Sequence, residues 1–246
     1  MNWRTILLGY FFIIPFGLLA FWWAVVCLSR REFLTAVVAV GFGVGFMSMC
    51  VPPTLSITSR IVPRASCDGQ GTMFRPDLLF DVATSLTIVA FIFSCAMFAV
   101  FNPLGMLDIP VPNAVRNSTP FLAGAVALMG IPVIWLTIRR RGIKYLRLTP
   151  AGYEVAESYV PERGSWDEVV EVTDVAPKDS RQVPNPLVLV KSDGTAAVLA
   201  AGPMTPGGRD LRELVRFYWQ HADLRDELTD GRAMERLRSK RFDADL

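Results

Sequence analysis

Histidine is nearly absent from this sequence, since His221 is the only one in 246 residues. A metal site built from several histidines therefore cannot form within one chain. The four cysteines include no Cys-x-x-Cys pair, and Cys27, Cys50 and Cys95 lie in apolar runs, where a thiol behaves as a small hydrophobic group. We expect neither a disulfide framework nor a zinc site.

Signatures of catalysis are missing as well. The sequence has no Gly-x-Ser-x-Gly nucleophile motif, no Walker A loop and no dinucleotide fingerprint between a strand and a helix. One acidic cluster has two interpretations, a solvated strand face or a divalent-cation site; its members are Asp167, Glu168, Glu171 and Asp174. His221 follows an apolar helical stripe, which favours a surface or helix-end role. We expect no enzyme activity, no cofactor and no metal.

Charge is scarce in the first half of the chain, although charged residues make up 20% of the whole. A helix needs about 20 apolar residues to cross the hydrocarbon core of a bilayer. Four runs meet this need and predict transmembrane helices at about 5–28, 33–51, 78–101 and 120–138. We therefore expect a four-helix membrane bundle over residues 1–140 and a separate domain over 141–246.

The distribution of Lys and Arg beside the spans predicts their orientation. With the N-terminus inside, eight basic residues flank the spans on the cytoplasmic side and three on the other. The eight are Arg4, Arg60, Arg64, Arg75, Arg139, Arg140, Arg141 and Lys144; the three are Arg30, Arg31 and Arg116. This favours a multi-pass protein of the plasma membrane with both termini in the cytoplasm. The net charge of +2 gives no general attraction to nucleic acid, so no nucleic-acid partner is expected.

Small residues recur within two spans. Gly41 and Gly45 share one helix face, and Ala123 and Ala127 share another, which allows a second helix to approach closely. This face has two interpretations, packing inside the bundle or docking of a partner. Asp81 lies about one turn inside the third span, where a carboxylate is favoured by the helix dipole. No ionisable residue lies near mid-membrane, so a transporter acting alone is the least favoured class.

Short strands and one amphipathic helix are predicted after residue 144. The strands are expected at 145–149, 153–158, 165–172, 187–191 and 195–201, with turns at Pro150–Gly152 and Ser192–Gly194. From Arg209, an apolar stripe recurs at helical spacing through Leu211, Leu214, Val215, Tyr218 and Trp219. Antiparallel strands followed by a helix that must cover them predict a small α+β domain.

These residues resemble a bacterial PH-like domain of membrane-anchored actinobacterial proteins. The resemblance rests on the run from Gly142 to Tyr153, on Ser165–Asp167, on the Asp193–Gly194 turn and on the segment from Leu214 to Leu228. It implies a binding domain with the usual seven strands, more than the five predicted above. A hairpin made of Leu55–Arg60 and Gly71–Arg75, between the second and third spans, would supply the missing strands by packing on this domain.

Two functional hypotheses follow. The first is a non-enzymatic accessory or scaffold subunit that docks on a larger membrane complex, for which the resemblance suggests a lipid importer of the Mce type. The second is a PH-like module that senses the anionic headgroups of membrane lipids. Basic residues near the membrane exit and in the tail favour lipid contact by about 1 kcal/mol each. They are Arg139, Arg140, Arg141, Arg236, Arg238, Lys240 and Arg241; the alternative for the tail is a solvated helix.

Overall fold

A computed structural model describes residues 3–109, 111–112, 114–140, 142, 144–157, 160–177 and 182–242, with only the backbone described for residues 3–6 and 140. The chain divides into two compact units. Asn2–Thr54 and Val82–Arg141 form the membrane unit, and Leu55–Asp81 and Gly142–Leu246 form the sheet unit. The segment between the second and third spans thus belongs with the C-terminal half of the chain.

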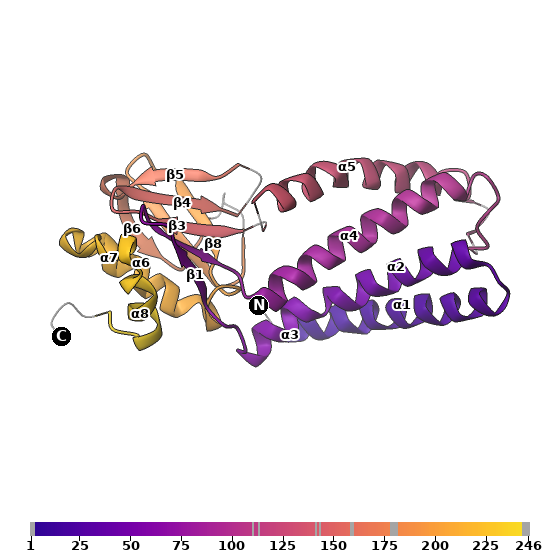
Figure 1. Ribbon diagram of the computed structural model, residues 1–246, viewed down its shortest axis with the longest axis horizontal. Coiled ribbons are helices and arrows are strands. Elements are labelled where there is room, and N and C mark those ends of the chain that lie inside the picture. The colour runs from indigo at the N-terminus through magenta and orange to yellow at the C-terminus, as the bar shows by residue number, and fades with distance from the viewer. Residues whose placement is uncertain are drawn as a thin grey trace. The chain divides into compact units, whose positions relative to one another are not determined.

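Among the described residues, four helical segments are long and apolar enough to cross a membrane. The helices concerned are α1 (Trp3–Ser29), α2 (Phe33–Met49) continued by α3 (Val51–Thr58), α4 (Leu78–Phe101) and α5 (Thr119–Arg140). The helices α1 and α2 lie side by side along their length (Figure 1), joined by a turn in which Arg31 adopts a left-handed conformation with φ 64°. Prolines lie inside α1 and α5, where the backbone remains helical.

One boundary in this region differs from the sequence-based expectation. The second span was expected to end at Pro52–Pro53, but the chain continues as α3 through Thr58. Proline is tolerated in the first turn of a helix because its missing N–H would have no partner there. The expected strand at Leu55–Arg60 is therefore wrong, since most of it is helical.

The described residues of the sheet unit form eight antiparallel strands in two sheets. The first sheet has the order β1-β2-β3-β4-β5 and the second the order β6-β7-β8. The strands are β1 (Arg64–Cys67), β2 (Thr72–Arg75), β3 (Tyr145–Leu148), β4 (Gly152–Ala156), β5 (Glu162–Ser165), β6 (Val169–Thr173), β7 (Pro186–Lys191) and β8 (Ala196–Ala200).

The expected packing of the inter-span hairpin on this domain is confirmed. In the pairing of β2 with β3, Thr72 lies opposite Leu148 and Phe74 opposite Leu146. Phe74, only 1% exposed, belongs to the core of the sheet unit. The second hairpin strand lies where it was expected, whereas the first lies at Arg64–Cys67.

The strand expected at residues 165–172 is in fact two strands in different sheets. The side chain of Ser165 accepts a hydrogen bond from the backbone N–H of Asp167 and caps the short 3₁₀ helix η1 (Trp166–Glu168). This turn carries the chain from β5 in the first sheet to β6 in the second. The side chain of Trp166 is buried in the core at the point of transfer.

Helices complete the sheet unit and gather beside the strands (Figure 1). They are the 3₁₀ turns η2 (Pro206–Gly208) and η3 (Ala222–Leu224) and the helices α6 (Arg209–Gln220), α7 (Glu227–Asp230) and α8 (Arg232–Ser239). The predicted stripe of α6 is confirmed, because Leu211, Leu214, Val215 and Tyr218 are fully buried. The two sheets, α6, α7 and α8 share one hydrophobic core.

Candidate interaction surfaces

The glycines of α2 pack within the membrane unit. A Cβ atom placed on Gly45 would lie 3.0 Å from the ring of Phe91 in α4, and one placed on Gly41 would overlap the side chain of Ser94 in the same helix. Both glycines therefore permit the close approach of α4. This contact agrees with the first interpretation of the glycine face, packing inside the bundle.

The alanines of α5 have different surroundings. Ala127 is buried, with 8% of its surface exposed. Ala123 lines an apolar cleft of about 620 Å³ among α1, α2, α4 and α5. Of these two small residues, Ala127 is thus packed inside the membrane unit and Ala123 borders the cleft.

Two of the four basic residues expected to form a lipid-binding tail bind to this chain instead. This segment forms helix α8, whose Ala233 and Leu237 are buried in the core. Arg236 pairs with Glu227, and Lys240 lies 3.0 Å from a carboxylate oxygen of Asp210. Arg238 and Arg241 remain exposed. Lys240 is also exposed, with 66% of its side-chain surface accessible, so Arg236 is the one of the four that is withdrawn from the surface.

Near the membrane exit, the guanidinium of Arg139 lies 5.0 Å from the ring centre of Trp135. Such a cation–π contact suits the headgroup region, where one end of an aromatic residue is apolar and the other polar. The side chain of Arg140 and the whole of Arg141 lie outside the described residues. Lipid contact at this exit stays a prediction.

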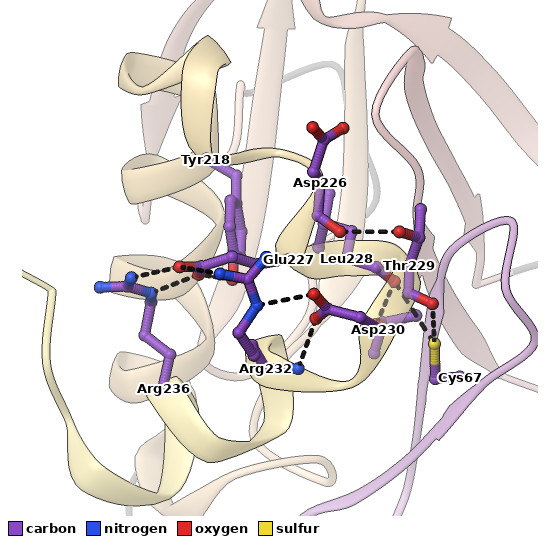
Figure 2. A network of polar contacts seen from close by, with 10 residues as sticks. Cys67, Tyr218, Asp226, Glu227, Leu228, Thr229, Asp230, Arg232 and Arg236 are labelled. Carbon is purple, nitrogen blue, oxygen red and sulfur yellow. Dashed lines mark hydrogen bonds and ion pairs between the residues drawn. The ribbon is translucent and has the colours of Figure 1, made fainter.

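The buried carboxylate of Glu227 in α7 forms hydrogen bonds with residues of α6 and α8 (Figure 2). Glu227, 6% exposed, accepts hydrogen bonds from Arg236 Nε at 2.8 Å, Arg236 Nη2 at 2.7 Å and the hydroxyl of Tyr218 at 3.0 Å. These bonds, those from Arg236 foremost, lower the pKa of Glu227 below its usual range, while burial and the adjacent carboxylate raise the pKa of Tyr218. The guanidinium of Arg236 also lies 4.1 Å from the ring centre of Phe217. This network fixes α8 on α6 and α7.

The inter-span hairpin is attached to the same region (Figure 2). The hydroxyl of Thr72 donates to the carbonyl of Leu228 at 2.7 Å, and the thiol of Cys67 donates to the carbonyl of Thr229 at 3.0 Å. Because these carbonyls belong to α7, that helix contacts the hairpin at Cys67 in β1 and at Thr72 in β2. Cys67 is a free thiol with a structural contact.

Most sheet edges are covered by other parts of the chain. At the edge of β6, Trp219 Nε1 donates to the carbonyl of Val169 at 3.0 Å, and Arg216 Nη2 donates to that of Val172 at 3.0 Å. At the edge of β8, the N–H of Ala200 donates to Glu157 at 3.0 Å. The last outer edge belongs to β5, and no described residue forms a hydrogen bond with it.

A cleft of about 500 Å³ lies on the five-stranded sheet and is lined by residues of β3, β4 and β5 and of neighbouring turns. Its polar lining includes Gln70, Arg147, Thr149, Glu154, Arg163 and Ser165. The charges are largely paired, since Arg147 lies 2.5 Å from Asp68 and Arg163 lies 3.3 Å from Glu154. Arg163 is nevertheless 75% exposed at its side chain, and Arg147 Nε makes no hydrogen bond with the described residues. The cleft offers donors and acceptors to a polar ligand or chain.

His221, Asp81 and the acidic cluster were further candidates for chemistry in the sequence, and the structure places them as follows. His221 ends α6, and its ring stacks on Phe217 with centres 4.5 Å apart. Asp81 lies in the first turn of α4. Of the acidic cluster, Asp174 lies 3.9 Å from Arg212. Within the described part of the chain, no three His, Cys, Asp or Glu side chains are grouped to hold a metal ion.

Besides Glu227, sequence reasoning missed two further buried acids, Asp77 and Glu157. Asp77 accepts from the N–H groups of Leu79 and Val62, both at 2.8 Å, and so caps α4 and fixes the segment that precedes β1. Glu157 forms an ion pair with Lys144 and accepts from Ala200. A signal for Glu157 was present, because the period-two alternation through Tyr153 and Val155 places it on the buried face.

Comparison of the chain with protein families, with curated proteins and with solved structures finds no match.

Proposed function

We propose that this protein is a non-enzymatic accessory or scaffold subunit that docks on a larger membrane complex, with the sheet unit as a PH-like adaptor. Eight strands in two antiparallel sheets, followed by an amphipathic helix, support the PH-like assignment. The observation that carries the adaptor role is the outer edge of β5, with which no described residue forms a hydrogen bond, whereas β1, β6 and β8 contact other residues of the same chain.

An uncovered strand edge presents unpaired N–H and C=O groups to any extended chain of matching length. Partner segments use such an edge by adding a strand to the sheet, and nearby pockets then select their side chains. The cleft beside β5 provides such a pocket, with Arg163 and Ser165 on the strand itself. We infer that an extended segment of a partner protein pairs with β5.

The charges on β5 support a selective contact. The strand has four residues and carries Glu162 and Arg163, and a short, charged edge disfavours unspecific pairing with apolar strands. A partner segment with an acidic residue facing Arg163 would gain a charge-assisted hydrogen bond. The Mce-type importer suggested by the resemblance is the candidate assembly.

The membrane arrangement is consistent with a cytoplasmic adaptor. The segments Leu55–Asp81 and Gly142–Leu246 fold into one unit, and the chain between them contains two spans. Two crossings bring both segments to the same side of the membrane. The excess of Lys and Arg beside the spans assigns that side to the cytoplasm, with both termini there.

The test is purification of the tagged full-length protein from its native membrane in a mild detergent. We expect a companion membrane protein at a fixed stoichiometry, and Arg163→Glu should reduce its recovery at least tenfold. Arg238→Glu is the matched control, because it reverses an exposed positive charge on α8 and should leave recovery unchanged.

Two results would contradict the proposal in different ways. A chain that purifies alone or only with copies of itself would remove the accessory role. A stoichiometric companion that withstands Arg163→Glu would keep that role but move the contact away from β5.

A further inference from the structure

The membrane unit contains a cleft that the adaptor role does not use. It measures about 620 Å³ and opens among α1, α2, α4 and α5. Aromatic side chains dominate its lining, including Phe16, Trp22, Phe42, Phe46 and Phe98, and Ala39 and Ala123 leave room between them. Binding sites for small molecules have this size and this apolar, aromatic character, and they occur between the helices of bundles.

The polar groups of this region gather at one end of the cleft. Trp23, which lines it, donates from Nε1 to the backbone carbonyl of Asp108 at 3.1 Å. The N–H of Asp108 donates to the hydroxyl of Thr35 at 3.1 Å, and its carboxylate lies 3.3 Å from Arg30. The site therefore has an apolar body inside the spans and a polar, charged end at the loops that join them.

We propose that this cleft binds one hydrocarbon chain of a membrane lipid, with the lipid headgroup at the Arg30 end. In a bilayer, an apolar cleft among the spans is filled by hydrocarbon because a void would lose dispersion contacts with its lining. A water molecule has too few polar partners there. The polar end matches the amphiphilic character of a phospholipid.

A partner helix is a poorer occupant. A helix with side chains is about 10 Å across and rises about 5.4 Å per turn, so fewer than two turns would fill this volume. A spanning partner helix needs about 20 residues and would extend far beyond it. A single flexible chain matches the available volume.

The cleft selects the chain of the lipid more than its headgroup. The positive charges of Arg30 and Arg31 lie beside the negative charges of Glu32 and Asp108, and Arg30 is paired with Asp108. This near balance provides no strong net attraction to anionic phosphate over a zwitterionic headgroup. Phosphatidylglycerol and phosphatidylethanolamine with the same chains should bind within about threefold of each other.

The experiment is native mass spectrometry of the delipidated full-length protein, titrated with palmitoyl-oleoyl phosphatidylglycerol in detergent. We expect one adduct that forms at lower lipid concentration than all others. Ala123→Phe fills the cleft and should raise the concentration for half-formation of this adduct at least tenfold. Ala125→Phe is the matched control, because Ala125 is exposed on the same helix, and its first adduct should resemble that of the parent protein.

A smaller substitution at the same position separates loss of lipid binding from misfolding. Ala123→Val adds only two methyl groups and should give a smaller loss in the same direction. Retention of the first adduct in both Ala123 variants, or an equal loss in Ala125→Phe, would overturn the proposal. A dimer of the chain that Ala123→Phe abolishes would also overturn it, by assigning the cleft to a second copy.

Discussion

The hydroxyl of Thr72 donates a hydrogen bond of 2.7 Å to the backbone carbonyl of Leu228, across 156 positions of sequence. Thr72 lies between two membrane spans, whereas Leu228 lies in a short helix near the C-terminus. Both residues are buried, at 1% and 0% exposure. The bond shows that the inter-span hairpin is part of the sheet unit, and its energetic role can be tested.

Thr72→Val should destabilise the sheet unit by about 1–3 kcal/mol, because a buried donor is lost while the carbonyl of Leu228 stays buried. Hydrogen exchange of the amides of β3 and β4 in the full-length protein reports this locally, with about tenfold faster exchange for each 1.4 kcal/mol. Thr195→Val is the control, since Thr195 is exposed and, among the described residues, its hydroxyl bonds only to Asp193. If Thr195→Val accelerated amide exchange as much as Thr72→Val, the bond from Thr72 to Leu228 would not be the cause of the destabilisation.

Two tyrosines allow a matched comparison. The hydroxyl of Tyr218 donates to the buried carboxylate of Glu227, so Tyr218→Phe should cost about 1.5–3 kcal/mol. The hydroxyl of Tyr153 is buried without a hydrogen bond to the described residues, and desolvation raises its pKa to about 12. Tyr153→Phe removes an unsatisfied polar group and should be neutral or stabilising. Amide exchange across the sheet unit measures the stability of both variants. A larger loss of stability in Tyr153→Phe than in Tyr218→Phe would contradict the hydrogen bond assigned to Tyr218 and Glu227.

The Glu227 network predicts a pH dependence with a definite sign. Hydrogen bonds from Arg236 and Tyr218 lower the folded-state pKa of Glu227 below its unfolded value. Its contribution to stability is therefore complete above the unfolded pKa, roughly 4.3, and is lost as the pH falls through the folded pKa. The stability advantage of the parent protein over Glu227→Gln should be constant from pH 8 to about 5 and shrink below that range. An advantage that instead grew on acidification would show that another group governs this region.

Gly45 and Gly9 test the packing of the membrane unit. Gly45→Leu forces a side chain toward the ring of Phe91, and overpacking of this kind costs about 1–3 kcal/mol. A Cβ atom placed on Gly9 would meet no atom within 4 Å outside the backbone of its own helix. The thermal midpoint for loss of helical signal in detergent should fall for Gly45→Leu and stay near the parent value for Gly9→Leu. A partner-docking role for Gly45 would instead leave the isolated chain stable.

The sequence by itself determined the four spans, the hairpin turns and helix α6. Each of these depends on a local pattern: an uninterrupted apolar run, a turn containing Asp and Gly, or an apolar stripe at helical spacing. Such patterns can be identified from neighbouring residues alone. The glycines of α2 were likewise recognised as sites of close approach, although not the helix that approaches them.

The packing of the inter-span hairpin on the C-terminal domain was expected from the sequence, but the tertiary structure alone decided which strand it pairs with and which other distant residues meet. The pairing of β2 with β3 and the contact of Gly45 with Phe91 join residues far apart in the chain. The ion pair of Glu227 with Arg236 joins residues of two different helices, α7 and α8. A carboxylate such as Glu227 has the same local sequence character whether it is solvated or buried, because its environment is provided by other elements. For the same reason, only the structure could identify the apolar cleft beside Ala123 and the outer edge of β5, with which no described residue forms a hydrogen bond.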